Sequence, residues 1–276
     1  MAETITVGDI SITPVRDAAI RTKASFLYPK VDPAEFARWS QYMEPETGRM
    51  EITVASFVLR DAGKTILVDT GLGDKARDRY PAGSLLENLR VAGIREEDVD
   101  IVVTTHLHVD HVGWNTVERD GERAITFPRA RYIIVRNEWD YFTTDPERRQ
   151  IDYIQDSVLP LEGSDQLELV DQAYVISPSL TMVPAPGHTP AHSCLAIVSR
   201  GERALIIGDL AHHPLQLTES DWEVVFDIDP ALACRSREEM AERLLNEGAL
   251  AIGGHFPWPG FGRVVKLDGR RLWQAL

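Results

Sequence analysis

Cysteine, basic charge and long apolar runs are all scarce in this sequence. The two cysteines, Cys194 and Cys234, form no CxxC pair, which excludes a cysteine-ligated zinc site and a thioredoxin-like motif. We expect both to be buried, reduced thiols. Acidic side chains outnumber basic ones 43 to 29, for a net charge of −14. This balance argues against nucleic acid or an anionic membrane surface as a partner, because both attract a basic protein face.

Features of exported and membrane proteins are missing as well. No apolar run approaches the roughly 20 residues that cross a bilayer. The first residues, from Met1 to Asp9, have neither the basic nor the apolar region of a signal peptide, so we expect a cytoplasmic protein. Histidine is absent from the first 105 residues, and all eight histidines lie between His106 and His255.

The pattern of apolar residues predicts a chain rich in strands, with few helices. The 276 residues are 43% apolar and 26% charged, as in an ordinary globular protein. Strands are predicted within 1–20 and at 52–59, 65–68, 99–104, 127–135, 167–176, 180–184, 194–198, 204–207 and 250–253, and helices at 85–92, 138–158 and 235–247.

No internal repeat or linker divides the chain, so we predict a single α/β domain over residues 1–276. It would contain two packed, mixed sheets flanked by helices, an N-terminal arm (1–50) and a helical insertion (136–165). The aromatic-rich part of the arm, residues 24–50, is either packed on the core or a cover over a substrate pocket.

Four possible metal donors follow the predicted strand 99–104: His106, His108, Asp110 and His111. In an extended chain, residues two apart face the same side, so His106 and His108 point together. Asp110 and His111 fall in the next turn and aim a second set of donors nearby. Imidazole and carboxylate suit zinc and similar divalent metals. Without a metal, each side chain would need its own hydrogen-bond partner or would add charge.

Three further donors stand directly after predicted strands. They are His188, Asp209 and His255, and each has a glycine immediately before it. Glycine lets backbone approach a crowded site, and functional residues often occupy such loops at the rim of an open α/β fold.

Taken in order, these segments resemble the signature of the metallo-β-lactamase fold superfamily. That signature is His-x-His-x-Asp-His, then a histidine in a Gly-His loop, an aspartate and a late histidine, and every position is filled here. The likeness runs from Ile52 to Val265. It implies an αββα sandwich with metal ions at one edge.

The resemblance also implies two divalent metal ions, with zinc as the default and manganese, iron or cobalt as alternatives. The implied ligands are His106, His108 and His188 for the first ion, Asp110, His111 and His255 for the second, and Asp209 as a bridge between them. Asp69 matches an acid that hydrogen-bonds a ligand histidine and so orients its ring.

Two such ions hold a hydroxide near neutral pH, which predicts hydrolysis at a C=O or P=O centre. The predicted catalytic residues are Asp209, which passes a proton to the leaving oxygen, Asp110 and His212. Acyl-homoserine lactonases of the family place a tyrosine where this chain has His212, so the lactone contact there differs. We expect His212 rather than His213 to face the pocket, and His192 to lie nearby without binding metal.

The segment from Gly254 to Gly262 resembles the lactonase and organophosphate-hydrolase branch of the superfamily. A small neutral substrate, a lactone or related ester, is therefore predicted, for a monomer or homodimer. A phosphotriesterase is the alternative, and a non-catalytic metal-binding protein is a third.

β-Lactamase activity is disfavoured because those enzymes generally have cysteine where Asp209 stands. Glutathione thioesters are disfavoured because no basic cluster is evident at the C-terminus. Candidate pocket walls are Phe26, Trp39, Trp139, Phe142 and Trp258.

Overall fold

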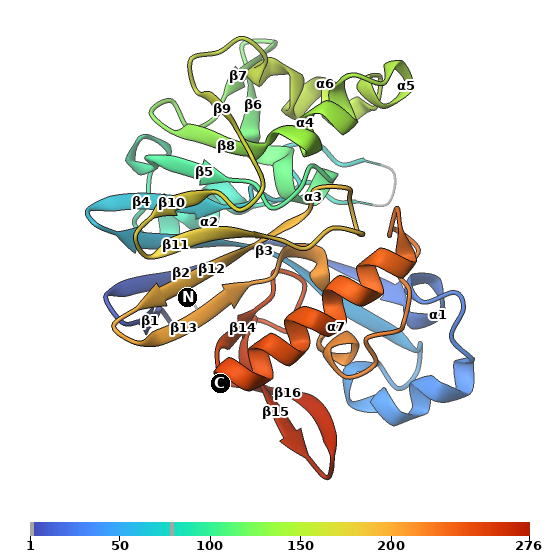
Figure 1. Ribbon diagram of the computed structural model, residues 1–276. Coiled ribbons are helices and arrows are strands. Elements are labelled where there is room, and N and C mark those ends of the chain that lie inside the picture. Colours follow the sequence, from blue (N-terminus) through green and yellow to red (C-terminus); the bar gives the residue numbers. More distant parts are fainter. Residues whose placement is uncertain (1–2, 78–79) are drawn as a thin grey trace.

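The computed structural model describes residues 3–77 and 80–276, and two β-sheets packed face to face form its centre (Figure 1). Within the described residues each sheet has seven strands. The first sheet has the spatial order β1 (Ile5–Val7), β2 (Ile10–Lys23), β3 (Arg49–Asp61), β4 (Lys64–Val68), β5 (Ile101–Val103), β8 (Arg131–Val135) and β9 (Leu167–Val170). The second has the order β10 (Val175–Ser177), β11 (Leu180–Pro184), β12 (Ser193–Ser199), β13 (Glu202–Ile206), β14 (Leu250–Ile252), β15 (Phe261–Leu267) and β16 (Arg270–Ala275).

Strand direction brings several loops to one edge of this sandwich. In the first sheet β4, β5 and β8 run parallel, so their carboxyl ends lie together. In the second sheet β13 and β14 are parallel, and β11 has the same direction because both it and β13 are antiparallel to β12. The loops that leave these carboxyl ends are where open α/β folds place their sites.

The described chain also forms helices, several of which pack on the outer faces of the sheets. They are α1 (Ala24–Leu27), α2 (Leu85–Val91), α3 (Val109–Val112), α4 (Arg136–Thr143), α5 (Pro146–Arg149), α6 (Asp152–Ser157) and α7 (Pro230–Glu247), with 3-10 turns η1 (Pro33–Tyr42), η2 (Glu96–Asp98), η3 (Gly113–Asn115), η4 (Leu159–Leu161), η5 (Gly208–Leu210) and η6 (Pro214–Leu217). In Figure 1 α4, α5 and α6 stand beside the first sheet, and α7 crosses the second.

Apolar side chains fill both the space between the sheets and the spaces under the helices. Phe57 and Ile133 of the first sheet pack in one buried cluster with Leu195 and Ile206 of the second. Separate clusters join α2, α4 and α6 to the outer face of the first sheet, and α7 to that of the second. Helix, sheet, sheet and helix therefore follow one another, which confirms the predicted αββα sandwich.

Helix α7 begins earlier than the predicted residue 235, and its end signals explain the bounds. Asp229 accepts a hydrogen bond from the backbone N–H of Leu232 at 2.9 Å, and Pro230 occupies the first turn, where no N–H is needed. The helix ends at Gly248, which has φ 58°, a left-handed conformation that glycine adopts without strain.

Several predicted strands differ from the observed ones. The prediction of one strand over 167–176 is wrong: β9 and β10 are separate and belong to different sheets, because the chain crosses between them near Ala173, which has φ 65°. The strand predicted at 127–135 begins only at Arg131. The small hairpin of β6 (Thr116–Arg119) and β7 (Glu122–Ile125), and the last hairpin, β15 with β16, were not predicted from their mixed, partly exposed sequences.

The first part of the predicted N-terminal arm, 1–50, belongs to the first sheet. Strand β2 pairs with β3 along most of its length, so only residues 24–48 leave the sheet, while residues 1–2 lie outside the described residues. Helices α4, α5 and α6 and the turn η4 occupy the chain between β8 and β9, where the helical insertion is predicted. Cys194 is buried, whereas Cys234 is only partly buried, contrary to expectation.

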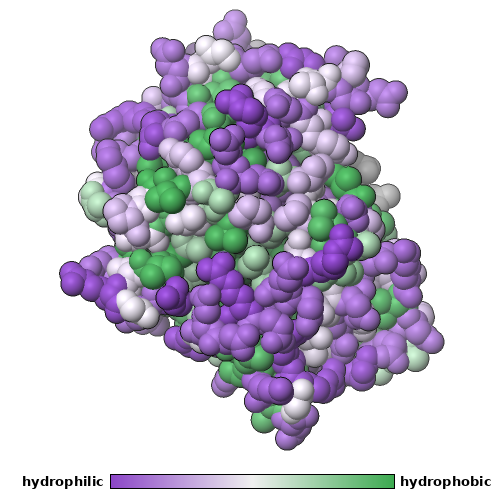
Figure 2. Space-filling view, in the orientation of Figure 1, coloured by the Kyte–Doolittle hydropathy of each residue, from purple (hydrophilic) through white to green (hydrophobic). Residues whose placement is uncertain are grey.

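Polar side chains cover most of the face in Figure 2, with apolar residues gathered in patches across its middle. In the described part of the chain, none of the helices combines the length and the apolar composition needed to span a bilayer.

Candidate metal centre

The first sheet supplies four donors from one continuous loop. His106 and His108 follow β5, and Asp110 and His111 lie in the short helix α3. Asp69, at the end of β4, has φ 58° and accepts hydrogen bonds from Thr105, from N–H at 2.8 Å and from Oγ1 at 2.9 Å. The neighbouring parallel strand end thus fixes the start of the loop that carries the donors.

The second sheet supplies three donors from three separate loops. His188 follows β11, Asp209 follows β13 and His255 follows β14. Two of these donors follow a glycine at a position where a larger residue would clash. A Cβ on Gly187 would lie 2.1 Å from the backbone N of Ala233, and one on Gly208 would lie 2.6 Å from His192 Nε2. Both also have positive φ, 131° and 52°.

His106, His108, His188 and Asp209 form one cluster of donors, with one ligand atom of each within 4.8 Å of the others. His188 Nε2 lies 2.8 Å from His108 Nδ1 and 3.2 Å from Asp209 Oδ2, and His106 Nε2 lies 3.7 Å from the same oxygen. We call His106, His108 and His188 the first group.

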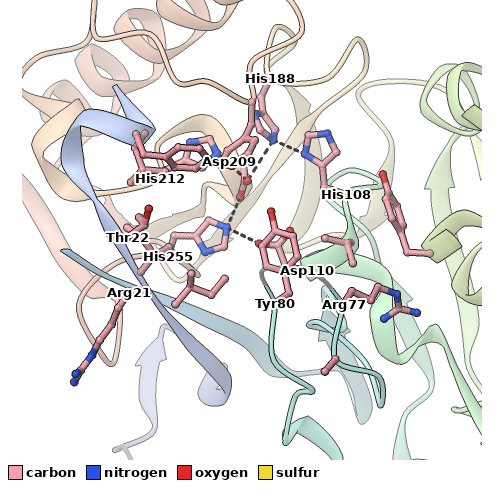
Figure 3. A pocket seen from close by; sticks show the side chains of 18 of the residues that line it. Arg21, Thr22, Arg77, Tyr80, His108, Asp110, His188, Asp209, His212 and His255 are labelled. Atoms are coloured by element: carbon pink, nitrogen blue, oxygen red, sulfur yellow. Dashed lines mark hydrogen bonds and ion pairs between the residues drawn. The ribbon is translucent and has the colours of Figure 1, made fainter. Parts of the chain in front are cut away.

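Asp110, His111 and His255 form a second cluster that meets the same distance criterion, and we call it the second group. Asp209 Oδ1 lies 3.0 Å from His111 Nε2 and 3.1 Å from His255 Nε2, while Oδ2 faces the first group. Figure 3 shows Asp209 between His188 and His255, with Asp110 beside His255. One carboxylate therefore stands between the two groups.

The charges at this site favour cations. Burial, together with neighbouring histidines, lowers the pKa of His106 and His108 well below the ordinary value, so their rings are neutral and carry free lone pairs. Burial also opposes charge on His188, but hydrogen bonds to Asp209 and Asp227 outweigh it and raise the pKa of His188 to about 9. The carboxylates thus attract positive charge into a buried space.

Burial alone would raise the pKa of Asp209, but His255 and His111 hold it well below its usual range, so the carboxylate is ionised. Among the described residues, His106 Nε2 is buried without a hydrogen-bond partner, and His111 Nε2 and Asp209 Oδ1 form no aligned hydrogen bond although they lie 3.0 Å apart. Such atoms are costly unless they bind something. Nitrogen lone pairs and carboxylate oxygens that face a common space are the donor set of zinc-like ions, so the residues fit two divalent cations.

Each group has a buried carboxylate behind one of its histidines. His111 Nδ1 lies 2.8 Å from Asp69 Oδ2, in the position predicted for Asp69. His188 Nδ1 lies 3.0 Å from Asp227 Oδ1, a partner that sequence reasoning missed because nothing in its local sequence marks it. The Nδ1 atom of His255 instead faces the backbone oxygen of Thr53 at 2.7 Å. These partners leave the opposite Nε2 atoms directed at the site.

The remaining histidines have different surroundings. His192 Nε2 accepts the backbone N–H of Asp209 at 3.0 Å, so this ring positions Asp209 without belonging to either donor group. His212 lines the cavity above the site, with Nε2 3.1 Å from Asp209 Oδ2. His213 is buried against Tyr42, with ring centroids 4.4 Å apart, and is not among the residues described as lining this cavity.

A cavity of about 940 Å³ opens onto both groups. Of the five aromatic residues proposed as its walls, Phe26 lines it. Trp39, Trp139 and Phe142 are buried in core clusters, and Trp258 is not among the lining residues, so those four predictions are wrong. Their spacing could not separate a core position from a cavity position. The aromatic lining residues that sequence reasoning missed are Tyr80, Tyr153 and Phe226.

Two packed sheets with seven histidine and aspartate donors at one edge define a metal-dependent hydrolase of the αββα class. The chain belongs to the metallo-beta-lactamase superfamily, whose family model matches residues 50–255. This confirms the family predicted from the motifs.

Named relatives agree with this assignment. An N-acyl homoserine lactonase of a Bacillus species is 24% identical over 224 residues, covering 75% of this chain and 82% of the relative. The N-acyl homoserine lactonase AttM of Azorhizobium caulinodans is 30% identical over 190 residues, covering 64% and 66%.

Two solved structures share the fold. AidC, described as a dizinc quorum-quenching lactonase, superposes with a TM-score of 0.84 at 23% identity, over 99% of this chain and 97% of its own. The hydrolase AbOPH gives a TM-score of 0.84 at 24% identity, over 99% and 96%.

Proposed function

We propose that this protein hydrolyses a lactone or a related uncharged ester with the help of two divalent cations. The ligands of the first cation would be His106, His108 and His188, those of the second Asp110, His111 and His255, and Asp209 would contact both. Zinc is the default metal for this donor set. The observation that carries the proposal is the cavity of about 940 Å³ whose floor is formed by residues of both groups.

The walls of the cavity suit a substrate with an apolar part and no charge. Ile20, Leu27, Ile52, Val109 and Phe226 line it, and apolar walls with a few polar groups are typical of small-molecule sites.

Charge at the cavity is balanced by ion pairs. Its two arginines in the described chain already face carboxylates: Arg77 lies 3.0 Å from Asp152 and 3.1 Å from Asp156, and Arg21 lies 3.4 Å from Glu44. An anionic substrate would have to compete for them.

When bound, two divalent cations supply Lewis-acid polarisation of the ester carbonyl and make water a nucleophile near neutral pH. The protein's own groups handle the proton. The carboxylates of Asp110 and Asp209 both face the cavity. They can accept the proton that the attacking water releases and return it to the leaving alkoxide oxygen, so that one water and one ester give an acid and an alcohol.

His212 would hold the substrate above the two groups. Burial lowers its pKa, so its ring is neutral and can donate one hydrogen bond. Its Nδ1 is buried without a hydrogen-bond partner among the described residues, and its Nε2 lies 3.1 Å from Asp209 Oδ2. A donor at this place, next to Asp209, would contact the ester group, as we infer for the tyrosine that lactonases of the family have there.

The test is a substrate panel on the full-length, zinc-loaded protein, with γ- and δ-lactones of increasing side-chain length, linear aryl esters and aryl phosphotriesters. We expect the highest kcat/KM on lactones, loss of activity on chelation and recovery on adding zinc. A higher kcat/KM on phosphotriesters would favour the alternative function. A protein that binds two metal ions and hydrolyses none of the panel would contradict the proposal in favour of a non-catalytic member.

A further inference from the structure

A buried carboxylate outside both donor groups joins the two loops that carry the first group. Glu138, the third residue of α4, is 1% exposed. Its Oε1 accepts the backbone N–H of Leu107 at 3.1 Å, and its Oε2 accepts the backbone N–H of Ala191 at 3.0 Å. Leu107 stands between His106 and His108, and Ala191 lies in the same loop as His188, between β11 and β12.

These two loops come from different sheets, so nothing local fixes their separation. The loop with His106 and His108 follows β5 of the first sheet, and the loop with His188 follows β11 of the second. Yet His108 Nδ1 and His188 Nε2 lie 2.8 Å apart. The loops are tied at a second place by the backbone hydrogen bond from Ser193 N–H to Thr105 O, at 3.0 Å.

A carboxylate at this place is unfavourable for folding alone. Burial raises the pKa of Glu138, which means that its charged form costs free energy despite the backbone hydrogen bonds. An apolar side chain of similar volume would avoid that cost, although it would leave the N–H groups of Leu107 and Ala191 without an acceptor. The negative charge is instead useful beside a group whose own three donors are all histidines and whose other carboxylate, Asp209, is shared.

We propose that Glu138 is a positioning residue for the first cation: it clamps the His106–His108 loop to the His188 loop and so sets the spacing of the first group. The inference rests on the proposed two-metal function. Because Glu138 touches neither donor group directly, it acts on metal affinity through the backbone. Loss of such an outer partner commonly lowers metal affinity about 10–100-fold.

The test compares two variants with two controls. Glu138→Gln keeps the shape but offers one acceptor, so its amide N–H₂ would face a second N–H donor. Glu138→Met removes both acceptors. Asp140→Asn removes an equal charge from an exposed position of the same helix. Asp69→Asn removes the support of His111 in the second group.

Each full-length protein is loaded with Co²⁺, and release of the two ions is followed by absorbance against increasing chelator. We expect Glu138→Gln to weaken one step about 10–100-fold and Glu138→Met to weaken the same step further. Asp69→Asn, which changes the partner of His111 and also an acceptor of Thr105, should weaken mainly the other step. Asp140→Asn should match the wild type. If Glu138→Met does not fold, Glu138→Gln alone decides.

Thermal unfolding in excess chelator measures the stability of each metal-free variant. It therefore separates a loss of metal affinity from a loss of stability of the fold. Equal weakening of both steps by Glu138→Gln, or wild-type release of both ions, would overturn the inference while leaving the proposed function intact. A wild-type protein that binds fewer than two Co²⁺ ions would overturn the proposed function, and this inference with it.

Discussion

The two halves of the molecule build one site in different ways. The first sheet contributes four donors within six residues, from His106 to His111, on a single loop. The second sheet contributes His188, Asp209 and His255 from three loops, each at the end of a different strand. The first set is placed by local backbone geometry, whereas the second depends on how strands β11, β13 and β14 pair.

This difference also appears in what supports each half. Behind His111 the support is near in the fold: Asp69 ends β4, which pairs directly with β5. Behind His188 the support comes from more distant parts of the chain. Asp227 lies beside His188 and is held in turn by Arg237 of α7, whose fully buried guanidinium lies 3.4 Å from Asp227 Oδ2. Arg237 also donates hydrogen bonds to the backbone oxygens of Leu210 and Trp222. The carboxylate behind His188 is therefore held by a buried arginine from a distant helix, whereas the carboxylate behind His111 comes from the neighbouring strand end.

The largest loss of activity is expected on substitution of Asp209, whose carboxylate stands between the two groups. Asp209→Ala should lower kcat/KM about 100-fold or more, because metal-ion catalysis contributes several kcal/mol and each ~1.4 kcal/mol is tenfold. Bound zinc, measured by elemental analysis, should fall below two ions per chain. A variant that kept both ions and full activity would refute a bridging role.

Disrupting the contact between Asp227 and Arg237 behind His188 should lower the free energy of unfolding. Asp227→Asn leaves Arg237 buried without its charge partner, a loss of about 3–5 kcal/mol in the free energy of unfolding. Arg243→Ala is the matched control, because its pair with Glu247 on the same helix is partly exposed and should contribute only about 0.5 kcal/mol. Denaturant unfolding in chelator measures both, and equal effects would show that the buried network has no special role.

Variants of His212 test whether the loops of the second sheet also contact the substrate. His212→Phe should leave both metal ions bound and lower kcat/KM about tenfold, the loss expected for one hydrogen bond of 1–2 kcal/mol. His212→Tyr restores a donor and should recover part of the loss. Kinetics of both variants unchanged from wild type on every substrate would remove His212 from the site.

The smallest effect, a change in stability, is expected at Glu238 of α7, which belongs to neither donor group. Hydrogen bonds to Arg271 and Ser220 lower the pKa of Glu238 to about 2, from an ordinary value of 4.5. A lowered folded-state pKa stabilises the protein above pH 4.5, and this stabilisation is lost as pH falls towards 2. Because Glu238 is half exposed, Glu238→Gln should cost at most about 1 kcal/mol at neutral pH.

The measurement for Glu238 is the difference in unfolding free energy between variant and wild type across pH 2–7, in which the titration of other groups cancels. Glu239→Gln, at the next and also exposed position, is the control. A difference that stayed constant from pH 7 down to 2 would show that the ion pair between Glu238 and Arg271 does not stabilise the protein.

The sequence predicted most of the sandwich because its buried strands and end signals are local. Strand β5 is uniformly apolar, and helix α2 ends next to Gly93 as predicted. Predictions failed where the chain changes sheets, at β9 and β10, since no local pattern says which sheet a strand joins. Trp139 was predicted as a wall and is a core residue, because an aromatic side chain on a helix gives the same signal in both places.

By itself the sequence determined the family, the fold class and the identity of the seven candidate donors, because those depend on residue type, order and spacing. Only the tertiary structure decided that Asp227, Glu138 and Arg237 support the site, and that Tyr80, Tyr153 and Phe226 line the cavity. Those roles arise from contacts between segments far apart in the chain. Such contacts are set by the packing of whole sheets and helices, which no single stretch of sequence encodes.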